Sequence, residues 1–152
     1  MLDTIDREIL RILERDAKTV AKTIADTLNL SKTPVYERIR KLEQEGYIKN
    51  YSAILDKTKI ESSITVFSFI SLDAQKGHLM DEFLALVKGF NEITECFVVG
   101  GEFDFLLKVV VKNLDAYYHF AKTKIATLPN IGAVKSAFVL KEVKDDTAFP
   151  LL

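Results

Sequence analysis

Residues 31–44 gather the kinds of side chain that contact nucleic-acid phosphates and base edges. When the segment is read as a helix at about 100° per residue, its polar side chains fall on one face. That face carries Thr33, Glu37, Arg40, Lys41 and Gln44, with Tyr36 on its flank. Arg and Lys bind phosphates or guanine, Glu accepts from cytosine, and Thr contacts the thymine methyl group. A solvated helix surface would carry the same charges, so the interpretation as a DNA-binding face also depends on the neighbouring sequence.

A helix-turn-helix pattern around this segment supports that interpretation. Apolar side chains in residues 20–28 repeat at helical spacing and predict a helix before the turn. Asn29 follows at the turn, where Asn tolerates the left-handed backbone conformation. Ser31 is expected to cap the second helix by accepting a backbone N–H, with Pro34 in its first turn. Two helices joined in this way present the second one to a DNA major groove.

The second helix is therefore predicted to read double-stranded DNA. Its apolar face, formed by Val35, Ile39 and Leu42, is expected to pack against the first helix of the motif. The predicted DNA contacts come from the start and the outward face of the second helix. They are Ser31, Lys32, Thr33, Tyr36, Glu37, Arg40 and Lys41.

The composition indicates a folded chain with an uneven charge distribution. Of the 152 residues, 48% are hydrophobic and 28% are charged, which is enough to form one large core or two small ones. The net charge of −1 divides into +2 for residues 1–60 and −3 for residues 61–152. Because +2 is a mild excess, DNA binding should depend on local placement and on several copies acting together.

Several function classes are disfavoured. The single Cys96 excludes an internal disulfide framework, and its apolar neighbours predict a buried structural thiol. His78 and His119 each lack a second ligand at helical spacing, so neither a metal site nor another cofactor is expected. There is neither an 18-residue apolar stretch nor a signal-peptide pattern, which predicts a cytoplasmic protein that does not enter a membrane.

The first part of the chain is predicted to form a DNA-binding head over residues 1–50. A first helix over 4–15 has Asp3 as its N-cap, and Gly46 is expected just beyond the end of the third helix. Three helices of this size form a compact winged or tri-helical unit. β-branched and aromatic residues in 47–56 predict an extended strand, so that residues 51–63 form a connecting strand and linker.

The remainder, residues 64–152, is predicted to form an α+β domain of the ferredoxin-like type. The segments follow one another as strand, helix, strand, strand, helix and strand. Asn113 is expected to cap the second helix, whose inner face is predicted to carry Leu114, Tyr118, Ala121, Ile125 and Leu128. The predicted strands are 64–72, 93–100, 104–111 and 133–143, and the first helix is 77–88.

This second domain is expected to need a partner. Two helices can cover only one face of its four-stranded sheet. Alternation along the strands places Leu106 and Val110 on the other face, together with Phe67 and Phe69. An exposed apolar face of this extent is a solubility liability in a monomer. The sequence therefore predicts a homodimer in which two such sheets pack together.

The order of the elements and several motifs resemble the Lrp/AsnC family, the feast/famine transcriptional regulators. The resemblance runs the whole length, from LDTIDREILRIL at the start, through the loop Gly100–Asp104, to the ending LKEVKDDTAFPLL. It implies dimers that assemble into tetramers or octamers. It also implies a small effector, in most cases an amino acid, which binds between dimers at the second domain and alters assembly or promoter choice.

The resemblance points to a set of effector-binding residues. From the residues alone, the glycine-rich loop is more simply a solvated hairpin turn. Within the resemblance, the glycines let backbone N–H groups approach a carboxylate and Asp104 pairs with an ammonium group. Phe103 adds a wall and Ser136 a hydroxyl group. Glu102 and Ser136 depart from the family's usual Asp and frequent Thr. The expected set is Gly100, Gly101, Glu102, Phe103, Asp104 and Ser136.

The sequence thus predicts a sequence-specific DNA-binding transcriptional regulator that responds to a small effector and is not an enzyme. Two rivals stay open. One is an architectural DNA protein whose second domain serves only oligomerisation, and it would show no response to small molecules. The other is an enzyme, because haem-pathway decarboxylases share this two-part fold. Such an enzyme would need basic residues around a large tetrapyrrole pocket, and the chain has only two histidines.

Overall fold

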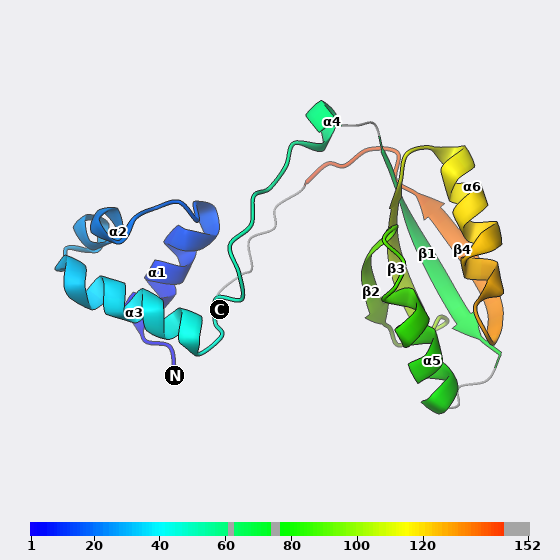
Figure 1. Ribbon diagram of the computed structural model, residues 1–152, viewed down its shortest axis with the longest axis horizontal. Coiled ribbons are helices and arrows are strands. Elements are labelled where there is room, and N and C mark those ends of the chain that lie inside the picture. The colour runs from blue at the N-terminus through cyan, green and yellow to red at the C-terminus, as the bar shows by residue number, and fades with distance from the viewer. Residues whose placement is uncertain (61–62, 74–76, 145–152) are drawn as a thin grey trace. The chain divides into compact units, whose positions relative to one another are not determined.

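The computed structural model describes residues 1–60, 63–73 and 77–144. It divides into a unit built on Met1–Leu55 and a unit built on Asp56–Val143 (Figure 1). The first unit contains the helices α1 (Thr4–Arg15), α2 (Ala21–Leu28) and α3 (Lys32–Gln44). The second contains α4 (Lys57–Ile60), β1 (Ile64–Leu72), α5 (Gly77–Val87), β2 (Ile93–Val98), β3 (Phe105–Val111), α6 (Leu114–Thr123), a 3₁₀ turn (Ile125–Thr127) and β4 (Ile131–Phe138).

The first unit is a three-helix head, as predicted. Asp3 caps α1 by accepting from the Asp6 N–H at 2.8 Å, and the Asp6 carboxylate accepts from the Asp3 N–H at 3.1 Å. This reciprocal arrangement satisfies two of the unpaired donors at the start of α1. The core of the head takes two side chains from each helix: Ile9 and Leu13, Ile24 and Ala25, Val35 and Leu42.

The segment after α3 differs in part from the prediction. Gly46 follows the C-cap of α3 with φ +75°, as expected of a residue just past a helix end. The expected strand over 47–56 does not form: residues 49–56 carry no regular secondary structure, and none of the described strands pairs with them. Tyr51 instead donates a hydrogen bond to Glu43 Oε1 at 2.8 Å. Burial, and then this carboxylate, raise the pKa of Tyr51 to about 12.

The second unit has the predicted ferredoxin-like topology. Its antiparallel sheet has the strand order β2-β3-β1-β4, and the chain connects the strands as βαββαβ. In the central pair, Val66 lies opposite Val109 and Ile70 opposite Phe105. Every second residue of β1 and β3 is buried, so one face of each central strand lies in the core.

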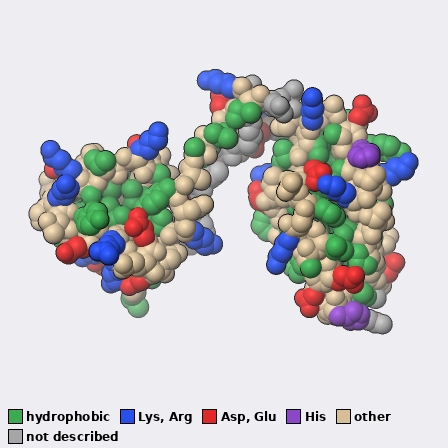
Figure 2. All heavy atoms as spheres, viewed as in Figure 1, with side chains coloured by type: hydrophobic (Ala, Val, Ile, Leu, Met, Phe, Trp, Pro, Cys, Tyr) green, Lys and Arg blue, Asp and Glu red, His purple; other side chains and the backbone are tan. Residues whose placement is uncertain are grey.

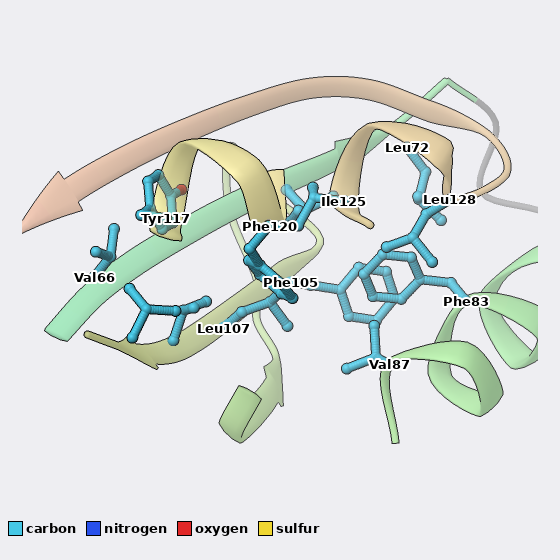
Figure 3. Close-up of a cluster of buried hydrophobic side chains, with 13 residues drawn as sticks. Val66, Leu72, Phe83, Val87, Phe105, Leu107, Tyr117, Phe120, Ile125 and Leu128 are labelled. Atoms are coloured by element: carbon cyan, nitrogen blue, oxygen red, sulfur yellow. The ribbon is translucent and has the colours of Figure 1, made fainter. Parts of the chain in front are cut away.

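Both long helices of this unit pack on that face. Phe83 of α5 stacks on Phe105 of β3, with ring centroids 4.2 Å apart and both side chains fully buried (Figure 3). Tyr117 and Phe120 supply the contribution of α6, and Ile125 of the 3₁₀ turn joins the same cluster. The opposite face of the sheet is left without a helix among the described elements.

The inner face of α6 corrects one prediction. Leu114 and Tyr118 were expected in the core, yet they are 60% and 65% exposed, whereas Tyr117 and Phe120 are buried. The predicted face assumed one continuous helix as far as Leu128. The helix ends at Thr123 and a 3₁₀ turn follows, so the residues on either side of the break belong to different helical phases.

The environment of Cys96 is a second correction. This thiol was expected to be buried among apolar residues, but it is exposed on β2. β2 is an edge strand of the sheet, and its neighbours Phe97 and Val98 are exposed as well. Hydrophobic side chains also reach the surface elsewhere in both units, between charged ones (Figure 2). In the ranges described, no helix has the length and hydropathy needed to cross a membrane.

Candidate DNA-reading helix and effector loop

The bend between α2 and α3 follows the predicted design. Asn29 has φ 54° and ψ 42°, the left-handed conformation that the turn requires. The Leu30 N–H donates to the Ala25 carbonyl at 2.9 Å, which closes the last turn of α2. Ala25 is buried at this point, so its small side chain lets α3 pack closely. The turn prediction is confirmed.

Ser31 corrects the predicted cap of α3. It occupies the N-cap position with an extended backbone, but its side chain makes no capping hydrogen bond. An N-cap side chain accepts from the backbone N–H two or three residues further on. The third residue after Ser31 is Pro34, which has no N–H, so one of the two possible donors is missing. The start of α3 is thus left without a side-chain cap.

The outward face of α3 is as expected. Val35 and Leu42 are buried, and Ile39 is half-buried between them. All seven predicted DNA-contact residues are exposed, and so is Gln44. Tyr36 is 58% exposed. The structure brings these residues together on one helix surface, from its N-terminal turn to its last turn.

The cationic side chains of α3 differ in the carboxylates that they contact. Lys41 lies 3.7 Å from Glu45 in an exposed pair, which holds it weakly. Arg40 and Lys32 form no ion pair within the described part of the chain. Arg38, by contrast, contacts Asp3 at 2.5 Å and Asp6 at 2.6 Å. Three of the four cations in residues 32–41 are therefore available to an external anion.

The second face of the sheet is apolar in the centre, as predicted. Phe67 and Phe69 of β1 lie on it together with Leu106 and Val110 of β3, all of them half-buried in the single chain. Lys108 Nζ lies 2.7 Å from Glu95 Oε1 on the same face and links β3 to β2. This surface is called the open face below.

The loop Gly100–Asp104 joins β2 to β3 and is fixed at both ends. The Val99 N–H donates to the Asp104 carbonyl, and the Asp104 N–H donates to the Ile70 carbonyl, each at 2.9 Å. Gly101 has φ +129°, a conformation that L side chains rarely adopt. Asp104 Oδ2 accepts from the Leu72 N–H at 2.8 Å. The half-buried Asp104 carboxylate therefore has a structural role, because it anchors the end of β1.

The middle of the loop bends over the open face. Phe103 packs against Phe69 with ring centroids 5.3 Å apart. Ser71 donates a hydrogen bond to the Glu102 carbonyl at 3.3 Å, and Lys135 Nζ lies 5.8 Å from the centroid of the Phe103 ring. The loop contributes the Phe103 ring and exposed backbone at its glycines, and the neighbouring strands add the Phe69 ring and the Lys135 cation.

Ser136 lies on the other face of the sheet. It pairs with the fully buried Ser68 in the β1–β4 register, and its hydroxyl lies 2.5 Å from Tyr117 Oη beneath α6. Tyr117 Oη lies 2.9 Å from Ser68 Oγ, which completes a chain of three hydroxyl groups. Within one chain, the structure does not bring the Ser136 hydroxyl and Phe103 to the same surface.

Lys135 is the residue that the sequence reasoning missed. Because side chains alternate along a strand, the neighbour of Ser136 must lie on the opposite face. That alternation was visible in the sequence, but the register that sets Lys135 beside Phe69 and close to Phe103 was not.

Comparison with known families divides the chain at similar points. Residues 2–49 match a family model described as winged helix-turn-helix DNA-binding. Residues 65–149 match one described as the Lrp/AsnC ligand binding domain.

Characterised relatives match along almost the entire chain. The Bkd operon transcriptional regulator of Pseudomonas aeruginosa is 37% identical over 150 residues, which cover 99% of this chain and 98% of that protein. The leucine-responsive regulatory protein of Escherichia coli is 35% identical over 143 residues, which cover 94% of this chain and 87% of that protein.

Solved structures are similar over the same extent. An AsnC family transcriptional regulator from Agrobacterium tumefaciens has a TM-score of 0.92 and 37% identity, with 99% of this chain and 97% of that chain covered. A transcriptional regulator from Neisseria meningitidis in complex with L-Met also has a TM-score of 0.92. It is 28% identical, with the same two shares covered.

Proposed function

This chain belongs to the Lrp/AsnC family of DNA-binding transcriptional regulators, and we propose from that premise how its own residues bind DNA and respond to an effector. The observation that carries the proposal is the exposed polar face of α3 on a buried apolar stripe. An arrangement of this kind lets a helix enter the major groove while its inner side stays in the core.

The side chains of α3 divide into two roles in DNA binding. Arg40 and Lys41 contact phosphates, and Lys32 adds a cation at the uncapped start of the helix. Thr33 and Glu37 contact base edges, with Tyr36 and Ser31 at the border of the same surface. Two heads in a dimer then reach successive major grooves about 34–36 Å apart, so the operators are approximately palindromic.

Salt-dependent binding tests this division. Arg40→Ala and Lys41→Ala should weaken binding to every sequence and reduce the salt slope by about one unit per lost phosphate contact. Glu37→Ala and Thr33→Ala should change which operators are preferred and leave the slope unaltered. Equal losses on every sequence from all four variants would contradict the two roles.

The open face supports a dimer in which two sheets pack together. Phe67, Phe69, Leu106 and Val110 give this face an apolar centre that no element of the single chain covers among the described residues. Leu106→Asp should yield monomers in sedimentation at micromolar concentration, while Leu114→Asp, on the exposed side of α6, should leave the dimer intact. A stable wild-type monomer would contradict the dimer. Larger assemblies, tetramers or octamers, would add heads and so gain avidity.

The effector is proposed to be an amino acid that binds at the loop Gly100–Asp104. A solved relative, the Neisseria regulator, is in complex with L-Met. In this chain, backbone N–H groups at Gly100 and Gly101 can meet a carboxylate, with Lys135 as a cation nearby. Asp104 offers a negative charge to the ammonium group. Such an effector shifts assembly only by its differential affinity for one state, typically about 1–3 kcal/mol.

A pair of substitutions separates the charge of Asp104 from its structural hydrogen bond. Asp104→Asn keeps an oxygen that can accept from the Leu72 N–H but removes the charge, whereas Asp104→Ala removes both. Both variants should lose the effector-dependent change in assembly, and both should keep operator affinity at low protein concentration. An unchanged response in Asp104→Asn would exclude an ion pair with the effector.

Ser136 and the identity of the effector can be tested together. A thermal-shift screen of the twenty amino acids, followed by sedimentation with each hit, identifies the ligand. Ser136→Ala should abolish that response if the Ser136 hydroxyl contacts the effector. Otherwise it should change only the stability of the domain, since the Ser136 hydroxyl is hydrogen-bonded to Tyr117.

The absence of any small-molecule response would favour the alternative of an architectural DNA protein. The chain's action on DNA is proposed to take place in the cytoplasm.

A further inference from the structure

Arg38 is set apart from the other cations of α3 by what it contacts. Its Nη1 lies 2.5 Å from Asp3 Oδ2 and 2.6 Å from Asp6 Oδ1. Those two carboxylates are also the two halves of the capping box at the start of α1. One guanidinium group therefore joins the middle of α3 to the N-terminus of a helix that begins more than thirty residues earlier.

Four hydrogen bonds connect the three residues of this network. Asp3 accepts from the Asp6 N–H, Asp6 accepts from the Asp3 N–H, and Arg38 donates to both carboxylates. The side chains of Asp6 and Arg38 are only 14% and 33% exposed, so water screens their pair less than it screens an exposed ion pair. The Asp6 N–H, and then the Arg38 guanidinium, hold the pKa of Asp3 below its ordinary value.

The position of Arg38 on α3 matters as much as its partners. It lies three residues after the buried Val35 and four before the buried Leu42, so it borders the core stripe on the flank of α3. Arg40 and Lys41 lie on the exposed face. A guanidinium group held by two carboxylates on the flank is a poor phosphate ligand, because binding a phosphate would break two charge-assisted hydrogen bonds.

We infer that Arg38 is a positioning residue for DNA reading: through Asp3 and Asp6 it fixes the orientation of α3 relative to α1, without contacting DNA itself. The buried core of the head is entirely apolar, and apolar contacts are non-directional, so they do not by themselves fix the rotation of α3 about its axis. Arg38 restrains that rotation at the flank. Asp3, although it caps another helix, thereby contributes to DNA reading. The inference rests on the proposed docking of α3 in the major groove.

Asp3→Asn gives the sharpest test. Asn is as good an N-cap as Asp, so α1 keeps its cap while one of the two charges that hold Arg38 is lost and Asp6 remains. Removal of an acidic charge ordinarily strengthens binding to DNA. Our inference predicts the opposite, a loss of operator affinity of about threefold. Unchanged or tighter binding by Asp3→Asn would overturn it.

Arg38 variants compared with Arg40 variants separate positioning from phosphate contact. Arg38→Met should bind every operator about tenfold more weakly with the wild-type salt slope, and Arg38→Lys should recover part of the loss. Arg40→Met should lower the slope. A slope lowered equally by Arg38→Met would make Arg38 a phosphate contact and overturn the inference. The double variant Asp3→Asn with Arg38→Met should bind no worse than Arg38→Met alone, because the two act through one contact.

A stability-matched control excludes a simple folding defect. Leu13→Ala removes core packing on α1 and leaves the Arg38 network untouched. All variants are assayed at a temperature at which circular dichroism shows a fully folded head. Leu13→Ala should then bind DNA as the wild type does, and a loss equal to that of Arg38→Met would overturn the positioning role. If Arg40→Met and Lys41→Met both leave affinity and slope unchanged, the docking of α3 itself fails, whatever Arg38 does.

Discussion

The chain of three hydroxyl groups under α6 should contribute measurably to the stability of the second unit. Tyr117 Oη lies between Ser68 Oγ at 2.9 Å and Ser136 Oγ at 2.5 Å. Ser68 is fully buried in the middle of β1, so it cannot turn to water for a partner. Tyr117→Phe removes the central oxygen and keeps the ring, including its edge-to-face contact with Phe138 at 5.2 Å.

The loss of stability in Tyr117→Phe depends on whether the Ser68 hydroxyl finds a new hydrogen-bond partner. Ser68 and Ser136 are cross-strand neighbours in the β1–β4 register, so their hydroxyl groups can approach each other once Tyr117 Oη is gone. Tyr117→Phe alone should therefore cost about 1 kcal/mol, the net value of one hydrogen bond. Combined with Ser136→Ala it should cost about 2–3 kcal/mol, because Ser68 is then buried without a side-chain partner. A further Ser68→Ala should recover most of that loss.

Amide hydrogen exchange of β1 and β4 is the suitable assay, because it reports the stability of this unit independently of the head. In thermal unfolding, each 1 kcal/mol should lower the Tm of a unit of this size by about 4–8 °C. A loss for the Tyr117→Phe/Ser136→Ala pair no greater than the sum of its two single losses would contradict the burial of an unpartnered Ser68 hydroxyl. Failure of Ser68→Ala to restore stability would refute it equally.

Three further predictions concern the backbone and the charges. Asn29→Ala should destabilise the head by about 1–2 kcal/mol in denaturant unfolding because of the left-handed conformation at this residue, whereas Asn29→Gly should be nearly neutral. Because the pKa of Asp3 is lowered in the folded head, the stability advantage of the wild type over Asp3→Asn should be fully present above pH 3.8. It should disappear as the pH falls below that value, and an advantage that persists in acid unfolding would contradict this assignment. Gly101→Ala should blunt the effector response in sedimentation and leave operator affinity intact; the strain arises from φ +129°, since the added Cβ would meet no atom within 4 Å.

The outcome for Ser31 illustrates how local rules can compete. The sequence held both facts, a good N-cap residue and a proline three residues later, and the proline removes one of the two backbone donors that the Ser31 side chain could have used. The prediction for the inner face of α6 failed for a different reason. The helix offered two apolar faces, one with Leu114 and Tyr118 and one with Tyr117 and Phe120. The helix ends at Thr123, and the second of these faces is the buried one. Periodicity cannot detect a change of helical phase that tertiary packing imposes.

The strand expected over 47–56 shows the same limit. Extended residues form a strand only beside a partner, and local composition does not tell whether a partner is there. The effector set also depended on register. Alternation alone could separate Lys135 from Ser136, but only strand pairing sets Lys135 beside Phe69 and turns the Ser136 hydroxyl toward Tyr117.

Sequence alone determined the features that rest on short-range physics. These are the Asn29 turn, the caps at Asp3 and Asn113, the polar face of α3 and the βαββαβ order of the second unit. Tertiary structure decided every feature that joins distant residues: the hold of Asp3 and Asp6 on Arg38, the anchoring of Leu72 by Asp104, and the register that sets Lys135 beside Phe69. The reason is physical. Caps and periodicity are set by neighbours within a few residues, whereas an ion pair or a strand register exists only after the chain has brought remote segments together.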